Sequence, residues 1–278
     1  MKPLKGLPRD RTLEQVQHHY RTEKAIADRL RQASREERTH IMATMYAELF
    51  QQVQDHPRLR KRQRVQAVAT FNKGMRPLLQ RFLQPSDRVA EFGPGDCRFT
   101  CEIARDVVFA YGIDISDQRN PADSFPPNFR LIVYDGYRLD AIAEGSLDLV
   151  YSDQIIEHFH PDDVAGHFRL VWRLLKPGGR YVFRTPHVLT GPHDVSQYFA
   201  LEPEGFHLKE WSYVELRALL EQQGFRDFLP FWNARGVHWP MPYRYFALCE
   251  GIIGRLPRRR LRPLIRYWIP SLTMVAVK

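Results

Sequence analysis

The chain has 278 residues, of which 44% are hydrophobic and 26% charged, a composition typical of a globular protein with a sizeable core. No apolar run approaches the ~18 residues that a membrane-spanning helix needs. The net charge of +9 is unevenly distributed, because residues 1–64 and 251–278 each carry +7 while residues 65–250 carry −5. An acidic central part argues against a protein that binds nucleic acid over its whole surface.

Two features of the sequence suggest the cellular compartment in which the protein works. Residues 1–10 contain charges and prolines but no apolar stretch, so we expect no secretory signal. Three cysteines, Cys97, Cys101 and Cys249, form neither a metal-binding spacing nor an even disulfide set. We therefore expect reduced thiols in a cytoplasmic protein.

The N-terminal part predicts helices. Between Thr12 and Val53 apolar residues recur every three or four positions, as on one face of a helix. Ser34 and Glu37 have the spacing of a capping box, which predicts where the second helix begins. We expect residues 1–64 to form a helical extension that packs as a lid over a ligand site in the rest of the chain.

The pattern then changes to short apolar runs separated by helix-length segments, which indicates βαβ units and a mainly parallel sheet. The first five predicted strands are Arg88–Phe92, Val107–Ile113, Arg130–Tyr134, Leu147–Ser152 and Arg180–Arg184. Two later runs, Phe225–Trp232 and Ser271–Val277, add strands at one edge. The predicted domain of residues 65–278 is thus a doubly wound α/β fold with seven strands and an aromatic, basic insertion at 233–270, before the last strand.

The first predicted strand leads into a glycine-rich turn. Glu91 lies near the strand's end, and Gly93 and Gly95 allow positive φ angles and close approach of a ligand to the backbone. Asp114 ends the second strand 23 residues after Glu91, where a carboxylate can accept both hydrogen bonds from a ribose diol. Asp135 ends the third strand 21 residues further on. Helix capping explains any one acid, but the set of three favours a ligand site.

The segment from Glu91 to Cys97 resembles the glycine-rich motif of class I S-adenosylmethionine-dependent methyltransferases, with Cys97 where that family often has a third glycine. The resemblance continues, in the family's order, through 147–159, 174–183, 207–212 and 224–225. A nicotinamide-dependent dehydrogenase is the main rival. Its Gly-x-Gly-x-x-Gly fingerprint requires a glycine where this chain has Arg98, so we reject it.

The resemblance implies S-adenosylmethionine as cofactor and a set of residues that bind it. Gly93 and Gly95 would face its methionine part, with Glu91 directed toward the amino group. The remaining implied contacts are Asp114 with Ile115 at the ribose, Asp135 and Gly136 at the adenine, and Asp153 and Gln154 beside the reactive methyl group.

Candidate catalytic residues follow the fourth and fifth strands. A base is needed only when the methyl acceptor must lose a proton, as a hydroxyl does. His158 is the first candidate for a base or an orienting group, although a purely structural role is equally compatible with its position. His193 with Asp194 is the second candidate, His207 is a weaker one, and we expect no metal.

The expected acceptor is an oxygen atom of a small-molecule, glycan-type or lipid-linked compound. RNA methylation is an alternative, but the chain has Ser152-Asp153-Gln154-Ile155 where methylation of base amino groups typically uses Asn/Asp-Pro-Pro-aromatic. A catalytically silent cofactor-binding scaffold is another alternative.

The basic and aromatic residues at 255–268 could bind anionic lipid or RNA phosphate, or could form a structural turn. The sequence leaves these three possibilities open, and it leaves the oligomeric state open as well.

Overall fold

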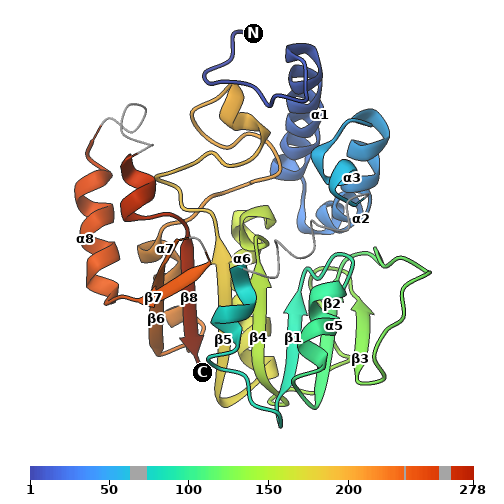
Figure 1. Ribbon diagram of the computed structural model, residues 1–278, viewed down its shortest axis with the longest axis vertical. Coiled ribbons are helices and arrows are strands. Elements are labelled where there is room, and N and C mark those ends of the chain that lie inside the picture. The colour runs from blue at the N-terminus through green and yellow to red at the C-terminus, as the bar shows by residue number, and fades with distance from the viewer. Residues whose placement is uncertain (63–73, 235, 257–263) are drawn as a thin grey trace.

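The computed structural model describes residues 1–62, 74–234, 236–256 and 264–278. Its centre is an eight-stranded sheet, flanked by helices on both faces, with the N-terminal helices placed across one end (Figure 1). The strands are β1 (Arg88–Phe92), β2 (Phe109–Asp114), β3 (Phe129–Val133), β4 (Leu147–Asp153), β5 (Leu175–Thr185), β6 (Asp227–Ala234), β7 (Val237–Pro240) and β8 (Leu272–Val277).

The strands lie in the order β3-β2-β1-β4-β5-β8-β6-β7. The first five are parallel, and β8 is antiparallel to both β5 and β6. The chain order reverses between β1 and β4, and open α/β sheets bind ligands outside the carboxyl ends of their strands at such a point. The topology thus predicts a ligand crevice beyond the ends of β1 and β4.

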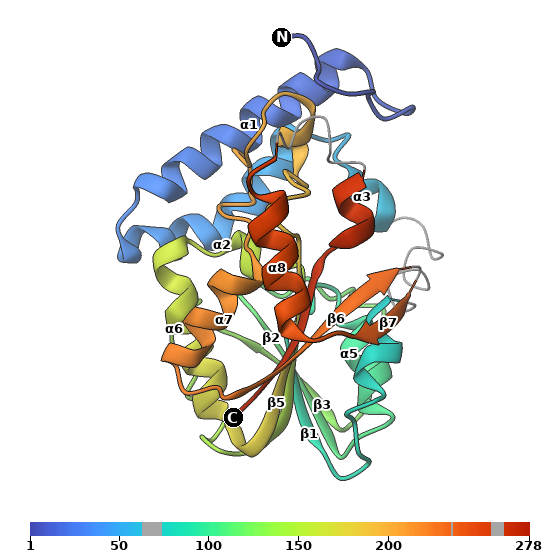
Figure 2. The same ribbon diagram turned by 90° about the vertical axis from the view of Figure 1, so that its left-hand side faces the viewer.

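Helices cover the two faces of the sheet. They are α1 (Leu13–Gln32), α2 (Arg35–Gln52), α3 (Pro57–Arg62), α5 (Arg98–Ala104), α6 (Pro161–Leu174), α7 (Tyr213–Gln222) and α8 (Tyr243–Ile253), with short 3-10 helices η1 (Ile156–His158) and η2 (Val195–Tyr198). Seen along the sheet, α6, α7 and α8 lie on one side and α5 on the other (Figure 2). Each layer buries its own apolar cluster against the sheet, which is the main stabilising contribution.

The expected doubly wound α/β fold is confirmed, but the seven-strand prediction is wrong for the residues that the structure describes. The eighth strand, β7, pairs with β6 at the sheet edge. Trp239 of β7 packs against Trp232 of β6 with ring centroids 5.2 Å apart. Such a cross-strand pair stabilises a four-residue strand that is too short to stand out in a sequence pattern. The last strand also lies inside the sheet, between β5 and β6, where it completes the core.

A buried ion pair and apolar contacts hold the N-terminal helices against the rest of the chain. Arg38 of α2 makes two hydrogen bonds to Asp163 of α6, at 2.9 and 3.0 Å. Ile26, Leu30 and Leu49 pack with Phe206 from the segment before α7. The capping box at Ser34 and Glu37 is confirmed at the start of α2.

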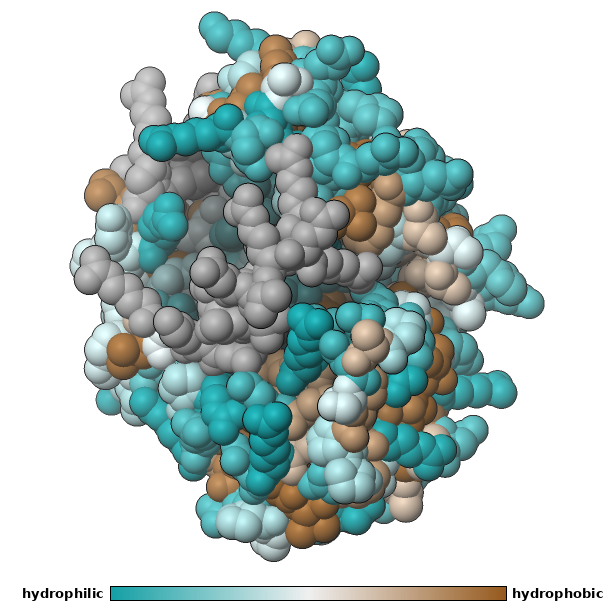
Figure 3. Space-filling view, turned by 45° about the vertical axis from the view of Figure 1, so that its right-hand side comes forward, coloured by the Kyte–Doolittle hydropathy of each residue, from teal (hydrophilic) through white to brown (hydrophobic). Residues whose placement is uncertain are grey.

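The outer surface of these helices is polar. Figure 3 shows mainly hydrophilic residues over the upper part of the molecule on that face. Lys24 and Arg31 both pair with Asp28, which makes a solvated face with ion pairs. Among the described residues, no helix combines the length and the apolar character needed to cross a bilayer.

Candidate active site

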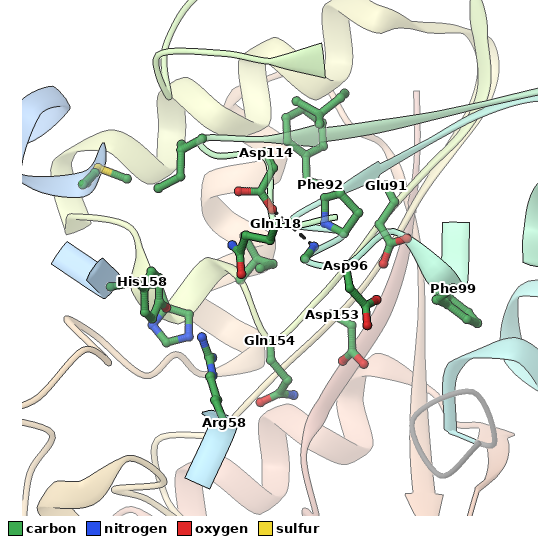
Figure 4. Close-up of a pocket in the computed structure, with 18 of the residues that line it drawn as sticks. Arg58, Glu91, Phe92, Asp96, Phe99, Asp114, Gln118, Asp153, Gln154 and His158 are labelled. Carbon is green, nitrogen blue, oxygen red and sulfur yellow. Dashed lines mark hydrogen bonds between the residues drawn. The ribbon is translucent and has the colours of Figure 1, made fainter. Parts of the chain in front are cut away.

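A cavity of about 610 Å³ lies beyond the carboxyl ends of β1, β2 and β4, beneath α2 and α3. Its volume falls in the range typical of cofactor sites. Figure 4 shows Arg58 beside His158 on one side of it, and Glu91, Asp96 and Asp153 on another. Eight of the predicted site residues line it: Glu91, Gly93, Gly95, Asp114, Ile115, Asp153, Gln154 and His158.

The turn after β1 has the backbone that glycine permits. Gly93 and Gly95 have φ angles of 71° and 56°. A Cβ atom on Gly93 would lie 2.1 Å from Cδ1 of Ile155, so a side chain has no room there. A Cβ atom on Gly95 would meet no described residue within 4 Å, which leaves its backbone open to a ligand in the cavity. Cys97 continues the turn in the left-handed region, with φ 64°, as the N-cap of α5.

Asp114 links β2 to this turn. Its carboxylate accepts hydrogen bonds from the backbone N–H groups of Gly95 at 3.3 Å and Ser116 at 3.2 Å. Burial raises the pKa of this carboxyl group, and the two N–H donors oppose that shift. The side chain borders the cavity, where it can accept hydrogen bonds from a diol.

Glu91 is buried at the end of β1. Its carboxylate accepts hydrogen bonds from the hydroxyl groups of Thr100 and Tyr151, the latter at 2.9 Å. Burial raises the pKa of Glu91 to about 8, even though these hydroxyl groups favour the ionised form. A cationic group beside it, such as the ammonium of an amino acid, would draw the carboxyl group into its ionised form.

Asp135 and Gly136 lie outside the residues that line the cavity. The Asp135 carboxylate accepts hydrogen bonds from the backbone of Tyr137 and Arg138, both at 2.7 Å, and so closes the turn after β3. Tyr134, at the end of that strand, lines the cavity instead. The adenine contact predicted for Asp135 and Gly136 stays a prediction. Tyr134, the residue before them, forms the cavity wall at this point.

The tip of β4 forms another wall. Asp153 receives two hydrogen bonds from Arg184 of β5, at 2.7 and 2.5 Å, which fixes the carboxylate and balances its charge. Gln154 follows with φ 58°, a conformation that costs energy for any residue except glycine. Backbone strain of this kind is concentrated at functional sites.

A second cavity, of about 250 Å³, adjoins the first. The two share Tyr46, Arg58 and His158 as walls. The Nδ1–H of His158 donates to the backbone carbonyl of Phe206 at 2.9 Å, which leaves Nε2 without a proton. Burial, together with the charges of His207 and Arg58, lowers the pKa of His158 well below its ordinary value. His158 is therefore neutral at physiological pH.

His193 and Asp194 line this second cavity, but they do not pair with each other. His193 Nδ1 lies 3.0 Å from a carboxylate oxygen of Glu210, whereas Asp194 accepts hydrogen bonds from the backbone of Ser196 and Gly205. The expected pairing of a base with an adjacent orienting carboxylate is wrong, because neighbouring residues in an extended segment point apart. Glu210 takes the orienting role and also accepts from His207 Nδ1 at 2.7 Å.

Several cavity residues were not predicted from the sequence. Met42, Met45 and Tyr46 reach the first cavity from α2, and Arg58 reaches both cavities from α3. They lie more than thirty residues before the glycine turn in the sequence. Their helical spacing also fits a purely structural face, so only the docking of α2 and α3 identifies them.

The comparisons with known proteins agree with this geometry. Residues 90–183 match the family model described as "Methyltransferase domain". No curated protein sequence matches the chain. A solved structure of Burkholderia thailandensis 1,6-didemethyltoxoflavin-N1-methyltransferase is 17% identical, with a TM-score of 0.54 over 88% of this chain and 91% of that one. A chain from the complex between the Haloferax volcanii Trm112 methyltransferase activator and a methyltransferase is 16% identical, with a TM-score of 0.53 over 74% and 89%.

At these identities the two structures establish a shared fold. The family match covers β1 through most of β5, including the glycine turn, Asp114 and the tip of β4. Residues 90–183 thus form a methyltransferase domain. S-adenosylhomocysteine, the demethylated form of S-adenosylmethionine, is bound in the Burkholderia structure, and S-adenosylmethionine is the methyl donor that the resemblance of the glycine turn implies.

Proposed function

We propose that the chain transfers a methyl group to an oxygen atom of a small-molecule, glycan-type or lipid-linked acceptor that binds in the second cavity. The observation that carries this proposal is the shared wall of Tyr46, Arg58 and His158. A donor in the larger cavity and an acceptor in the smaller one would meet at that wall. Methyl transfer is an in-line displacement, so placing the two reactants on opposite sides of the moving group is the main requirement.

The larger cavity fits the donor. Gly95 offers open backbone, Asp114 offers a carboxylate for the ribose hydroxyls, and Glu91 offers one for the ammonium. Asp153 and Gln154 would lie beside the reactive centre. S-adenosylmethionine supplies the methyl group, activated by its sulfonium charge; the chain supplies position and exclusion of water.

The smaller cavity fits a polar acceptor of about one ring in size. Arg11, Arg58, His193 and His207 line it, together with the carboxylate of Asp194. Such a wall offers hydrogen-bond donors and acceptors to hydroxyl groups and positive charge to an anionic substituent. Neutral His158, with its free Nε2, can accept the proton of an acceptor hydroxyl as the new C–O bond forms.

A second part of the proposal concerns location: we propose that the protein works in the cytoplasm, at a membrane surface. Several apolar side chains of α8 and the adjacent helical residues 264–268 are exposed: Leu248, Ile252, Leu264, Tyr267 and Trp268. The Tyr245 hydroxyl donates to the Trp268 carbonyl at 3.3 Å, so the two helical segments are neighbours. The arginines at 258–260 and 262 join them in sequence, although residues 257–263 lie outside the described part of the chain. Exposed apolar side chains that flank a basic stretch of sequence favour contact with anionic lipid.

Labelled donor tests the acceptor class. The purified protein is incubated with methyl-labelled S-adenosylmethionine and separate lipid, polysaccharide, RNA and small-metabolite fractions of a cell extract. We expect label in a lipid, glycan or metabolite fraction, and a product whose methyl group is bound to oxygen. Label in RNA would replace this proposal with the RNA alternative. Donor binding without any labelled product would support the silent scaffold.

Vesicle sedimentation tests the location. Unchanged protein should sediment with vesicles that contain anionic lipid and much less with neutral vesicles. Ile252→Ser with Trp268→Ser should reduce the bound fraction. Val108→Ser is the matched control, because Val108 is also an exposed apolar residue but precedes β2. Equal binding of both variants would contradict the membrane proposal.

A further inference from the structure

Three potential metal ligands lie close together beside the two cavities, of which His158 lines both and His207 lines the second. Glu157 and His158 belong to η1, and His207 lies in the segment before α7. One ligand atom from each lies within 4.8 Å of the others. The two histidines lie 49 residues apart in the chain, and the sequence, with few zinc-like carboxylates, predicted no metal.

Glu157 supplies the first argument. Its side chain is fully buried, and one carboxylate oxygen, Oε2, accepts a hydrogen bond from the Thr185 hydroxyl at 2.9 Å. The other oxygen, Oε1, is buried and has no hydrogen-bond partner among the residues that the structure describes. A buried polar atom left unpaired costs roughly 1–3 kcal/mol. Because such atoms are rare in native proteins, Oε1 indicates a ligand that the polypeptide itself does not provide.

The two histidines supply the second argument. The Nδ1–H of His158 donates to the Phe206 carbonyl at 2.9 Å, and the Nδ1–H of His207 donates to Glu210 at 2.7 Å. His158 therefore keeps the lone pair on Nε2, and His207 keeps it whenever its ring is neutral. Histidines that bind metals are almost always held in this way, with the second ring nitrogen bonded to a carbonyl or a carboxylate.

A second cluster in the same region lacks these features. His19, Glu23 and His56 are also close together, but His19 bonds to Arg11 and to Glu23. The other Glu23 oxygen accepts from the backbone N–H of Phe206. The ligand atoms of His19 and Glu23 are already used, and the Arg11 guanidinium beside them repels a cation. The contrast shows that proximity of such residues does not by itself create a free ligand set.

We propose that Glu157, His158 and His207 bind a divalent transition-metal ion, with Zn²⁺ the preferred metal. Two imidazole nitrogens and one carboxylate oxygen form a known zinc ligand set, which leaves a fourth position open. Ligand atoms around tetrahedral zinc are about 3.4 Å apart, as Zn–N distances of about 2.0–2.1 Å require, so small side-chain rotations complete the site. Iron is also bound by such triads, but methyl transfer from a sulfonium involves no redox step.

The surrounding charges favour a cation. The carboxylate of Glu210 is bonded to His207, and the carboxylates of Glu157 and Asp194 are close enough to act on its charge. These carboxylates also stabilise a metal ion. Arg58, which also borders both cavities, is the opposing charge.

A role in methyl transfer, unlike the binding itself, rests on the proposed function. The site lies beside the wall shared by the two cavities, where a cation lowers the pKa of a hydroxyl group at its open position. The hydroxyl proton then leaves to solvent, and His158 acts as a ligand instead of a base. The methyl group is transferred from sulfur to that oxygen.

Cobalt titration tests the binding. Full-length protein treated with a chelator is titrated with Co²⁺, followed by the visible absorption of a low-coordinate Co²⁺ ion and by competition with Zn²⁺. We expect one ion per chain, with binding weakened at least about tenfold in Glu157→Gln and His207→Gln and also in Glu210→Gln, which removes an orienting carboxylate. His193→Gln is the matched control, since it also contacts Glu210 but is not a ligand, and it should bind Co²⁺ like the unchanged protein.

Binding of S-adenosylmethionine, measured on each variant, establishes that the variant is folded. An unchanged protein that binds neither Co²⁺ nor Zn²⁺ would overturn the proposal, and so would ligand variants that bind as tightly as the unchanged chain. Neither measurement needs an acceptor, so a failed search for the acceptor leaves the metal site standing. Once the acceptor is known, full methyl transfer by metal-free protein would refute the catalytic role alone.

Discussion

The carboxylate of Asp114 accepts a hydrogen bond from the backbone N–H of Gly95, 3.3 Å away, and so joins the tip of β2 to the turn after β1. One side chain thereby supports the turn and faces the cavity. Asp114→Asn keeps the shape but removes the charge, and Asp114→Ala removes both. We expect donor affinity to fall about tenfold for Asn and more for Ala, because hydrogen bonds to a charged group contribute about 1.5–3 kcal/mol.

Isothermal titration with S-adenosylmethionine measures this effect. Asp117 is a suitable control, because it lies in the following loop and pairs with Arg119 on the surface. Asp117→Asn should leave donor affinity unchanged. Donor binding that survives Asp114→Ala intact would contradict the predicted ribose contact.

Gly93 and Ile155 form a second testable pair. Gly93→Ala would place a Cβ atom 2.1 Å from Ile155 Cδ1 and hold a non-glycine residue at a φ angle of 71°. We expect a loss of about 2–4 kcal/mol in the free energy of unfolding, the sum of overpacking and a left-handed backbone. Chemical denaturation measures it.

The double variant Gly93→Ala with Ile155→Ala separates the two costs. Removing the Ile155 side chain relieves the clash but not the backbone strain, so the double variant should be more stable than the two single effects combined predict. Gly145→Ala provides a control for the φ angle alone, because Gly145 has a φ angle of 62° with no atom near its Cβ position. Strict additivity in the double variant would show that the contact is not the cause.

The ion pair between Arg38 and Asp163 joins α2 to α6, and both side chains are largely buried. Within the described part of the chain, Arg38→Met leaves the Asp163 carboxylate with the Tyr137 hydroxyl, 2.9 Å away, as its side-chain partner. We expect a loss of about 3 kcal/mol, the usual result of removing one partner of a buried pair. Because α2 carries Met42, Met45 and Tyr46 into the cavity, donor affinity should fall as well.

Thermal unfolding and donor titration together check this prediction. Lys24→Met is the matched control, because Lys24 pairs with Asp28 on the surface, where an ion pair contributes less than about 1 kcal/mol. Equal stability of the two variants would mean that Arg38 does not hold the helix in place.

Glu91 predicts a pH dependence of stability. Its pKa is about 8 in the folded chain against an ordinary value of 4.5. Between these values the unfolded chain has lost the proton and the folded chain retains it, so the free energy of unfolding falls as pH rises. Each unit of such a difference corresponds to about 1.4 kcal/mol, reduced by relaxation of the buried site.

Denaturation at pH 5.5 and pH 8 measures the effect. Glu91→Gln keeps a neutral side chain of similar shape, so its stability should fall less over this interval than that of the unchanged chain. A parallel fall in the two proteins would show that other groups cause the pH dependence. Addition of S-adenosylmethionine, whose ammonium favours the ionised carboxylate, should also reduce the fall in the unchanged chain.

Local sequence determined the central sheet and half of the site. The strand Arg88–Phe92 was predicted with its observed bounds, and Glu91, Gly93, Gly95 and Asp114 line the cavity as expected. These features depend on short-range chemistry: a buried strand, glycine where φ is positive, and a carboxylate at a strand end. Each of these requirements is met by a few consecutive residues, so it can be predicted from the sequence.

Only the tertiary structure decided the rest. In the structure the partner of His193 is Glu210, where the sequence had suggested Asp194. His207 lies beside Glu157 and His158, although 49 residues separate it from His158 in the chain. It also placed Arg58 at the wall of both cavities and Trp239 against Trp232 in an eighth strand. The same physical reason applies to all four cases. Which side chains meet depends on how whole helices and loops dock by burying apolar surface. Because apolar contacts are not directional, the sequence of one element does not reveal which other element it packs against.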